Sequence, residues 1–114
     1  MMPEMDGFEQ ELKTLKDAYA EQLPEKLAQM EVLWRGLIEQ GWNEECFKAF
    51  HRMVHSMAGS APVFGFTAVG RSARELEARL MAISASGAPL SDVDGKEFSS
   101  LMATIRASAQ LLDD

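Results

Sequence analysis

The sequence predicts an all-α protein, an up-and-down antiparallel four-helix bundle with an additional N-terminal helix. Apolar residues recur at three- and four-residue spacing through most of the 114-residue chain, and no segment alternates with the two-residue period of a strand. Short connections that contain glycine or proline separate the helical stretches. Short connections favour antiparallel packing of consecutive helices. The 46% of hydrophobic residues can form one buried core. We therefore expect an irregular arm over residues 1–7 and a single bundle domain over residues 8–114.

The first two predicted helices are separated at Pro24. Residues 8–21 carry an apolar stripe at helical spacing and are expected to pack as a cap on one end of the bundle. Because proline is favoured in the first turn of a helix, a second helix is predicted to begin near Leu23 and to end at Gly41. The first stripe consists of Phe8, Leu12, Leu15 and Tyr19, and the second of Leu27, Met30, Leu33, Trp34, Leu37 and Ile38.

The third predicted helix begins at a clear capping signal. Asn43 is a preferred N-cap residue, and Trp42 before it is expected to pack on Phe47 as a hydrophobic staple. Because Pro62 lacks a backbone donor and disfavours helical geometry before it, the helix is predicted to end near Ala61. Its inner stripe consists of Cys46, Phe47, Phe50, Val54, Met57 and Ala61.

Two further helices are predicted in the remainder of the chain. The fourth is expected over about residues 66–86, with an exit loop at residues 87–89. Ser91 is expected to cap the last helix, because acidic residues follow it in the first turn. The inner stripe of the fourth helix consists of Val69, Ala73, Leu76, Leu80 and Ile83, and that of the last helix of Val93, Phe98, Leu101, Ile105 and Leu112.

The charge balance narrows the classes of partner. Eighteen acidic and eleven basic residues give a formal charge of −7, which disfavours nucleic acid and anionic membranes because both are polyanions. No apolar run approaches the ~20 residues of a membrane span, and the N-terminus lacks a signal-peptide pattern. Cys46 is the single cysteine, which excludes an internal disulfide and indicates a buried structural thiol. We expect a monomeric cytoplasmic protein without nucleic-acid or membrane partners.

The polar side of the third helix carries the candidate site. His55 points almost directly away from the apolar stripe, and Gly59 lies one turn along the same row. A glycine inside a helix costs roughly 1 kcal/mol relative to alanine, so its presence here indicates that a partner approaches closely. A neutral imidazole has a nitrogen lone pair, so an exposed histidine can accept a phosphoryl group as a nucleophile. The candidate partner-binding surface consists of Lys48, His51, Arg52, Ser56, Ala58 and Gly59.

Other site chemistries fit the sequence less well. His51 and His55 have the spacing of a shared metal site, but Arg52 stands where the metalloprotease motif requires Glu, and no third ligand is evident. Cys46 is predicted to face inward, away from both histidines, which excludes a catalytic Cys-His pair. The sequence also lacks a phosphate-binding glycine loop and a nucleophile elbow. We therefore expect neither a cofactor nor a metal in this chain.

Three stretches resemble the signature of histidine-containing phosphotransfer (HPt) domains. They are His55-Ser56-Met57-Ala58-Gly59-Ser60-Ala61, Phe64-Gly65-Phe66 and Ala73-Arg74-Glu75-Leu76-Glu77. Weaker similarity extends the resemblance over most of the chain, at Leu23-Pro24-Glu25-Lys26-Leu27 and Gly41-Trp42. The chain is similar in particular to HPt domains that are fused to receiver and diguanylate cyclase domains.

The resemblance implies a phosphocarrier rather than an enzyme. His55 would accept a phosphoryl group from a phospho-Asp on one receiver domain and pass it to another, with Gly59 providing clearance. The implied partners are response-regulator receiver domains and a hybrid sensor kinase, and Mg²⁺ is expected on the receiver. The family usually has Lys where this chain has Ala58. Either Arg52, Lys48 or Arg74 replaces that cation, or the phosphohistidine is more labile.

Two alternatives remain open, and a second resemblance is set aside. The chain could be a non-catalytic adaptor that docks a receiver or kinase through the same face, a reading that Ala58 favours. It could instead accept phosphate from an ATP-binding histidine kinase domain. Residues 1–9 resemble the segment that follows the phosphorylated Asp of receivers, but the acceptor Asp and the alternating strands of that fold are absent, so the chain is not predicted to be a receiver.

Overall fold

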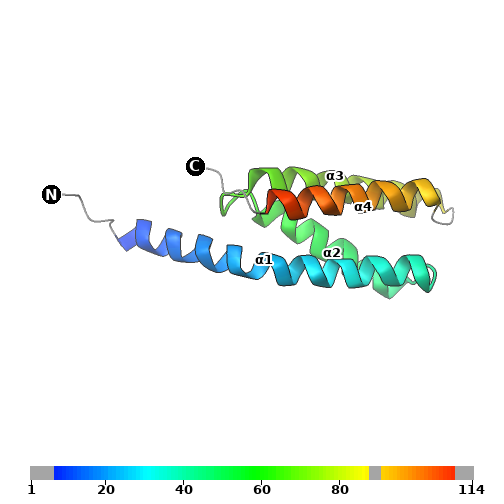
Figure 1. The fold of residues 1–114 in the computed structure, drawn as a ribbon, viewed down its shortest axis with the longest axis horizontal. Helices are drawn as coiled ribbons and strands as arrows, with labels where there is room; N and C mark the ends of the chain where they lie inside the picture. The colour runs from blue at the N-terminus through cyan, green and yellow to red at the C-terminus, as the bar shows by residue number, and fades with distance from the viewer. Residues whose placement is uncertain (1–6, 88–90, 110–114) are drawn as a thin grey trace.

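The computed structural model describes residues 7–87 and 91–109, and over these residues it contains four helices and no strand (Figure 1). Helix α1 spans Gly7–Glu39, α2 spans Glu44–Ser60, α3 spans Thr67–Ser86 and α4 spans Asp92–Ser108. The predicted all-α class is confirmed. None of the described helices is both long and apolar enough to cross a membrane.

The four helices pack as an antiparallel bundle around one apolar core. Contacts join α1 to α2, α2 to α3, α3 to α4 and α4 back to α1, so every helix buries one face against two neighbours. Rings from three helices meet at its centre, where Trp34 lies 4.3 Å from Phe98 and 5.9 Å from Phe50 between ring centroids. The largest fully buried side chains are Phe50, Phe98, Leu23, Met30, Leu37, Leu76, Leu80, Ile105, Val54 and Val69.

Helix α1 corrects the prediction of two helices divided at Pro24. The helix runs through this proline and has 33 residues in all, so the described residues before Pro24 form no separate helix that caps the bundle. Proline removes one helical hydrogen bond and crowds the carbonyl of the preceding turn, a cost of about 3 kcal/mol. Here the neighbouring turns bury Leu23, Leu27 and Met30 against the bundle, and this packing holds the two halves in one helix.

The N-terminal part of α1 extends beyond the other three helices (Figure 1). The first buried residue of α1 is Tyr19, whereas Phe8 and Leu15 are 72% and 55% exposed. The expected packing of residues 8–21 on the end of the bundle is therefore wrong for their first three turns. This projection makes the described part of the molecule elongated along α1.

The predicted capping signals are confirmed. The side chain of Asn43 accepts a hydrogen bond from the backbone N–H of Cys46 at 3.0 Å, and Trp42 packs on Phe47 with ring centroids 4.7 Å apart. Ser91 and Asp94 form a reciprocal capping box at the start of α4. Gly41, Gly65 and Gly87 have positive φ angles in the three connections, a backbone region that favours glycine.

Two predicted core positions face solvent instead. Val93 is 64% exposed in the first turn of α4, and Ile38 is 48% exposed near the end of α1. The predicted arm over residues 1–6, the exit-loop residues 88–89 and the inner position Leu112 lie outside the described residues. Gly7, assigned to the arm, is the first residue of α1.

Candidate functional site

Helix α2 presents His55 to solvent. Phe50, Val54 and Met57 are almost completely buried on its inner face, and this anchors the helix with its opposite face outward. The His55 side chain is 73% exposed. The predicted orientation of His55 is therefore the observed one.

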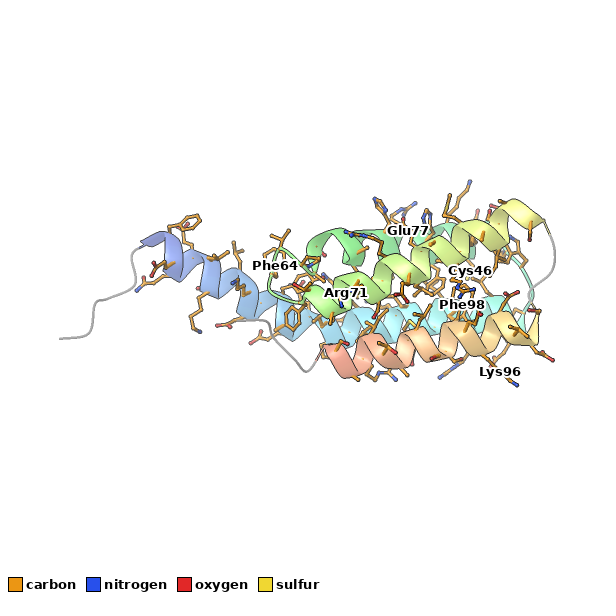
Figure 2. All side chains as sticks on the ribbon, turned by 90° about the horizontal axis from the view of Figure 1, so that it is seen from above. Cys46, Phe64, Arg71, Glu77, Lys96 and Phe98 are labelled. Carbon is orange, nitrogen blue, oxygen red and sulfur yellow. The ribbon has the colours of Figure 1, made fainter. Side chains whose placement is uncertain are left out.

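Glu77 on α3 fixes the His55 ring. Its Oε2 atom lies 2.6 Å from His55 Nδ1, across the interface between α2 and α3. An ionised carboxylate can only accept, so Nδ1 carries the proton and donates it. The lone pair of the neutral ring then lies on Nε2. Figure 2 shows Glu77 at the outer edge of α3, away from the core residue Phe98.

The same carboxylate oxygen also binds His51. Its Nε2 lies 3.0 Å from Glu77 Oε2, and its side chain is 30% exposed. Its ring also stacks on Phe47, with centroids 6.0 Å apart. The two histidines therefore differ. His55 binds Glu77 through Nδ1, so its Nε2 points outward, whereas His51 binds Glu77 through Nε2.

The pKa of Glu77 reflects this double contact. Partial burial of the carboxyl raises its pKa, but the hydrogen bonds and positive charge of His55 and His51 together outweigh burial. The pKa of Glu77 is consequently below its ordinary value of 4.5. Glu77 is therefore ionised at neutral pH and accepts from both rings.

Gly59 leaves open space one turn beyond His55. The residue is exposed, and a Cβ atom placed on it would meet no heavy atom within 4 Å. A side chain at this position would occupy the space next to the imidazole, so the glycine keeps it free for a partner.

Ala58 does not belong to the exposed surface. It is only 4% exposed and forms part of the apolar core, so we remove it from the candidate partner-binding residues. Its carbonyl oxygen lies 3.4 Å from where a Cβ of Gly70 would stand, which places Ala58 at the close contact between α2 and α3. The remaining exposed members of the predicted surface are Lys48, Arg52, Ser56 and Gly59, with half-buried His51 beside them.

A groove between α1 and α2 adjoins this surface, and sequence reasoning did not identify it. One part has a volume of about 280 Å³ and the next about 430 Å³, and the two share Gln29 and Met53. Cationic side chains line the end nearer His55, whereas Val32, 67% exposed, lines the apolar end. The lining comprises Lys26, Gln29, Arg52, Met53, Ser56 and Met57 in the first part, and Glu25, Ala28, Gln29, Val32, Leu33 and Met53 in the second.

Metal and thiol chemistry find no support in the geometry. Within the described ranges, no group of three or more His, Cys, Asp or Glu residues could hold a metal ion. The thiol of Cys46 donates to the backbone carbonyl of Leu33 at 3.2 Å, which directs it toward α1 and away from the histidines. Cys46 is partly buried, in keeping with a structural role.

Comparison with protein families decides the class of protein. The Hpt domain family model matches residues 9–112, nearly the whole chain. The chain belongs to the Hpt domain family. Hpt domains take part in histidine phosphotransfer in two-component relays, where they interact with receiver domains and kinases. No curated protein and no solved structure matches this Hpt domain.

The contact that sequence reasoning missed in this Hpt domain is the one made by Glu77. The Leu76-Glu77 pair was part of the resemblance, but the sequence did not predict a role for Glu77. His55 and Glu77 are 22 positions apart in the sequence and lie on different helices. A usable signal was available: Leu76 is fully buried in α3, so the adjacent glutamate lies beside that inner face, toward a neighbouring helix.

Proposed function

We propose that the chain is a phosphorelay intermediate that accepts a phosphoryl group on His55 from the phospho-Asp of one receiver domain and passes it to another. The observation that carries this proposal is the exposed His55 ring, with Nδ1 bound to Glu77 and open space above Gly59. This arrangement leaves Nε2 as the free nucleophile.

The proposed transfer balances as a simple displacement at phosphorus. The Nε2 lone pair forms the N–P bond while the P–O bond to the receiver's aspartate breaks, and the electron pair leaves with that carboxylate. The ring gains positive charge as the bond forms. The Nδ1–H remains hydrogen-bonded to the Glu77 carboxylate, which stabilises that charge. Mg²⁺ and the remaining charge stabilisation belong to the receiver, and the reverse displacement returns the group to a second receiver.

The surroundings of His55 suit a receiver's active-site face. Lys48 and Arg52 are exposed and, within the described part of the chain, make no ion pair, so both are available to an acidic partner. The groove between α1 and α2 offers an apolar strip beside these cations. We propose that a receiver covers Gly59 and extends into this groove.

A transfer assay tests the proposal. The chain is incubated with a receiver labelled on its aspartate, and acid-labile, base-stable label is measured on the chain. We expect label on the wild type and on His51→Gln, and none on His55→Gln, with circular dichroism confirming that both variants are folded. Label retained by His55→Gln would refute His55 as the acceptor.

A non-catalytic adaptor is the second candidate, and Ala58 is the observation that favours it. The usual cation of the family is absent from this position, and the alanine here is buried. An adaptor would bind receivers with equal affinity after His55→Ala and would carry no label. Binding and labelling measured on the same wild-type and His55→Ala samples separate the two functions.

A further inference from the structure

The projecting part of α1 carries an apolar face that the rest of the described chain leaves uncovered. The N-terminal part of α1 lies beyond the end of the bundle, as both views show (Figures 1 and 2), and Tyr19 is the first buried residue of this helix. Phe8 is 72% exposed and Leu15 is 55% exposed, and Leu12 lies between them on the same side. A contiguous apolar strip that is exposed to water on a helix indicates an interaction surface.

The spacing of this strip is that of a coiled-coil seam. Phe8, Leu12, Leu15 and Tyr19 are separated by four, three and four residues, the a and d positions of a heptad. The opposite face is polar. There, Lys13 and Asp17 form an ion pair at 2.8 Å, and Thr14 donates to the carbonyl of Gln10. The segment therefore has one apolar side for a partner and one side for water.

The position of the chain's own bundle determines how a second helix fits. At Tyr19 the seam meets the connection between α2 and α3, where the ring stacks on Phe64 at 4.8 Å and the hydroxyl lies 2.8 Å from Ser60 Oγ. A second copy running parallel and in register would carry its helix and its bundle into this region. An antiparallel copy would place its bundle at the opposite end, beyond Phe8, where Gly7 is the one described residue of the first chain.

The charges beside the seam suit the antiparallel arrangement. Glu9 and Lys16 lie on the same flank of the helix, at successive e positions. Antiparallel pairing brings e positions of the two helices together, so Lys16 of each copy faces Glu9 of the other. A two-fold axis repeats this contact on both sides, which makes the surface self-complementary.

We propose that residues 8–19 form an antiparallel two-helix interface with the same residues of a second copy. Leu12 of one copy packs against Leu15 of the other, and Phe8 packs near Tyr19 and Phe64. The interface is small, so the dimer is expected to be weak and to dissociate on dilution. This proposal replaces the monomer expected from the sequence. It is independent of the phosphotransfer proposal because His55 takes no part in it.

Sedimentation velocity of the full 114-residue chain tests the dimer. From about 5 µM to about 500 µM, the wild type is expected to shift from monomer to dimer by mass action. Leu15→Lys should remain monomeric over the same range. Met81→Lys is the matched control, because Met81 is 51% exposed on α3, away from the seam, and this variant should dimerise as the wild type does. A wild type that stays monomeric, or a Leu15→Lys variant that dimerises equally, would overturn the proposal.

Charge reversal tests the orientation. Lys16→Glu should weaken the dimer several-fold, and combining it with Glu9→Lys should restore the affinity. In a parallel pair, Lys16 would face Glu11 instead, so rescue by Glu11→Lys and not by Glu9→Lys would contradict the antiparallel arrangement. Disulfide trapping gives a second readout: a mixture of Leu12→Cys and Leu15→Cys chains should cross-link faster than either variant alone. Equal or slower cross-linking of the mixture would count against the proposed register.

Discussion

Glu77 and His55 meet across the α2–α3 interface at 2.6 Å, and this contact gives an exposed histidine a defined orientation and tautomer. A histidine on an isolated helix would rotate freely and would exchange its proton between both nitrogens. Here the carboxylate, with a side chain only 22% exposed, holds Nδ1–H and directs Nε2 outward. Helix α3 thus orients the nucleophilic nitrogen through Glu77, although Glu77 itself does not contact the phosphoryl group.

Glu77→Ala is expected to slow phosphoryl transfer to His55 by roughly 10- to 100-fold, since a hydrogen bond to a charged group contributes about 1.5–3 kcal/mol. Glu77→Gln should retain part of the rate, because its amide oxygen still accepts from Nδ1–H but carries no charge. Single-turnover transfer from a phosphorylated receiver measures both rates. Rates equal to the wild type in both variants would show that Glu77 does not position His55.

The depressed pKa of Glu77 predicts how stability depends on pH. A carboxyl whose pKa is lower in the folded than in the unfolded chain adds stability above its unfolded pKa, and this contribution is lost as the pH falls through the folded pKa. The wild type should therefore exceed Glu77→Gln in stability above about pH 5, and this difference should shrink below Glu77's ordinary pKa of 4.5. Urea unfolding at several pH values measures this difference. Glu75→Gln, at an exposed position on the same helix, is the control and should show no such trend.

Two glycines near the contact of α2 and α3 should respond oppositely to alanine. At Gly59 an added Cβ meets open space, so Gly59→Ala should raise the free energy of unfolding by about 0.5–1 kcal/mol through helix propensity. At Gly70 the added Cβ would clash with ring carbons of Pro62, so Gly70→Ala should lower the free energy of unfolding by about 1–3 kcal/mol. Chemical denaturation measures both changes. Equal signs would contradict the packing described at these positions.

A larger side chain at Gly59 should impair transfer while the protein stays folded. Gly59→Gln is expected to reduce the rate of phosphoryl transfer about tenfold or more, because the side chain fills the space that a receiver must enter beside His55. Gly95→Gln is the matched control, since Gly95 also has no neighbour within 4 Å of an added Cβ but lies on α4. Transfer kinetics and thermal unfolding are measured on both. A control that loses as much activity would show that the effect is not local.

Local signals in the sequence predicted most of the bundle and the exposed histidine. Asn43, Ser91 and the positive-φ glycines mark helix ends through short-range chemistry, which can be recognised from neighbouring residues. The buried face of α2 was predicted in the same way, from the three- and four-residue spacing of its apolar residues. His55 and Gly59 could be placed outward because they lie opposite that face.

The errors concern features that depend on distant parts of the chain. Pro24 has a strong local tendency to end a helix, and only the burial of adjacent turns against the other helices explains why α1 continues. The error at Ala58 is of another kind: it lies four residues after buried Val54, at the edge of the apolar stripe, and it was counted as a surface residue because the family usually has Lys there. The contact of Glu77 with both histidines likewise depends on how α3 sits beside α2, which periodicity within one helix does not specify.

The exposure of His55 also has a consequence for how long a signal persists. Because 73% of the side chain is exposed, a phosphoryl group on the outward ring nitrogen would stand in solvent, where water can attack its phosphorus. On the proposed function, a phosphoryl group there would be protected from hydrolysis only while a receiver covers it. The free phosphorylated chain would then act as a short-lived messenger, and the local abundance of receivers would set how much of the signal is delivered.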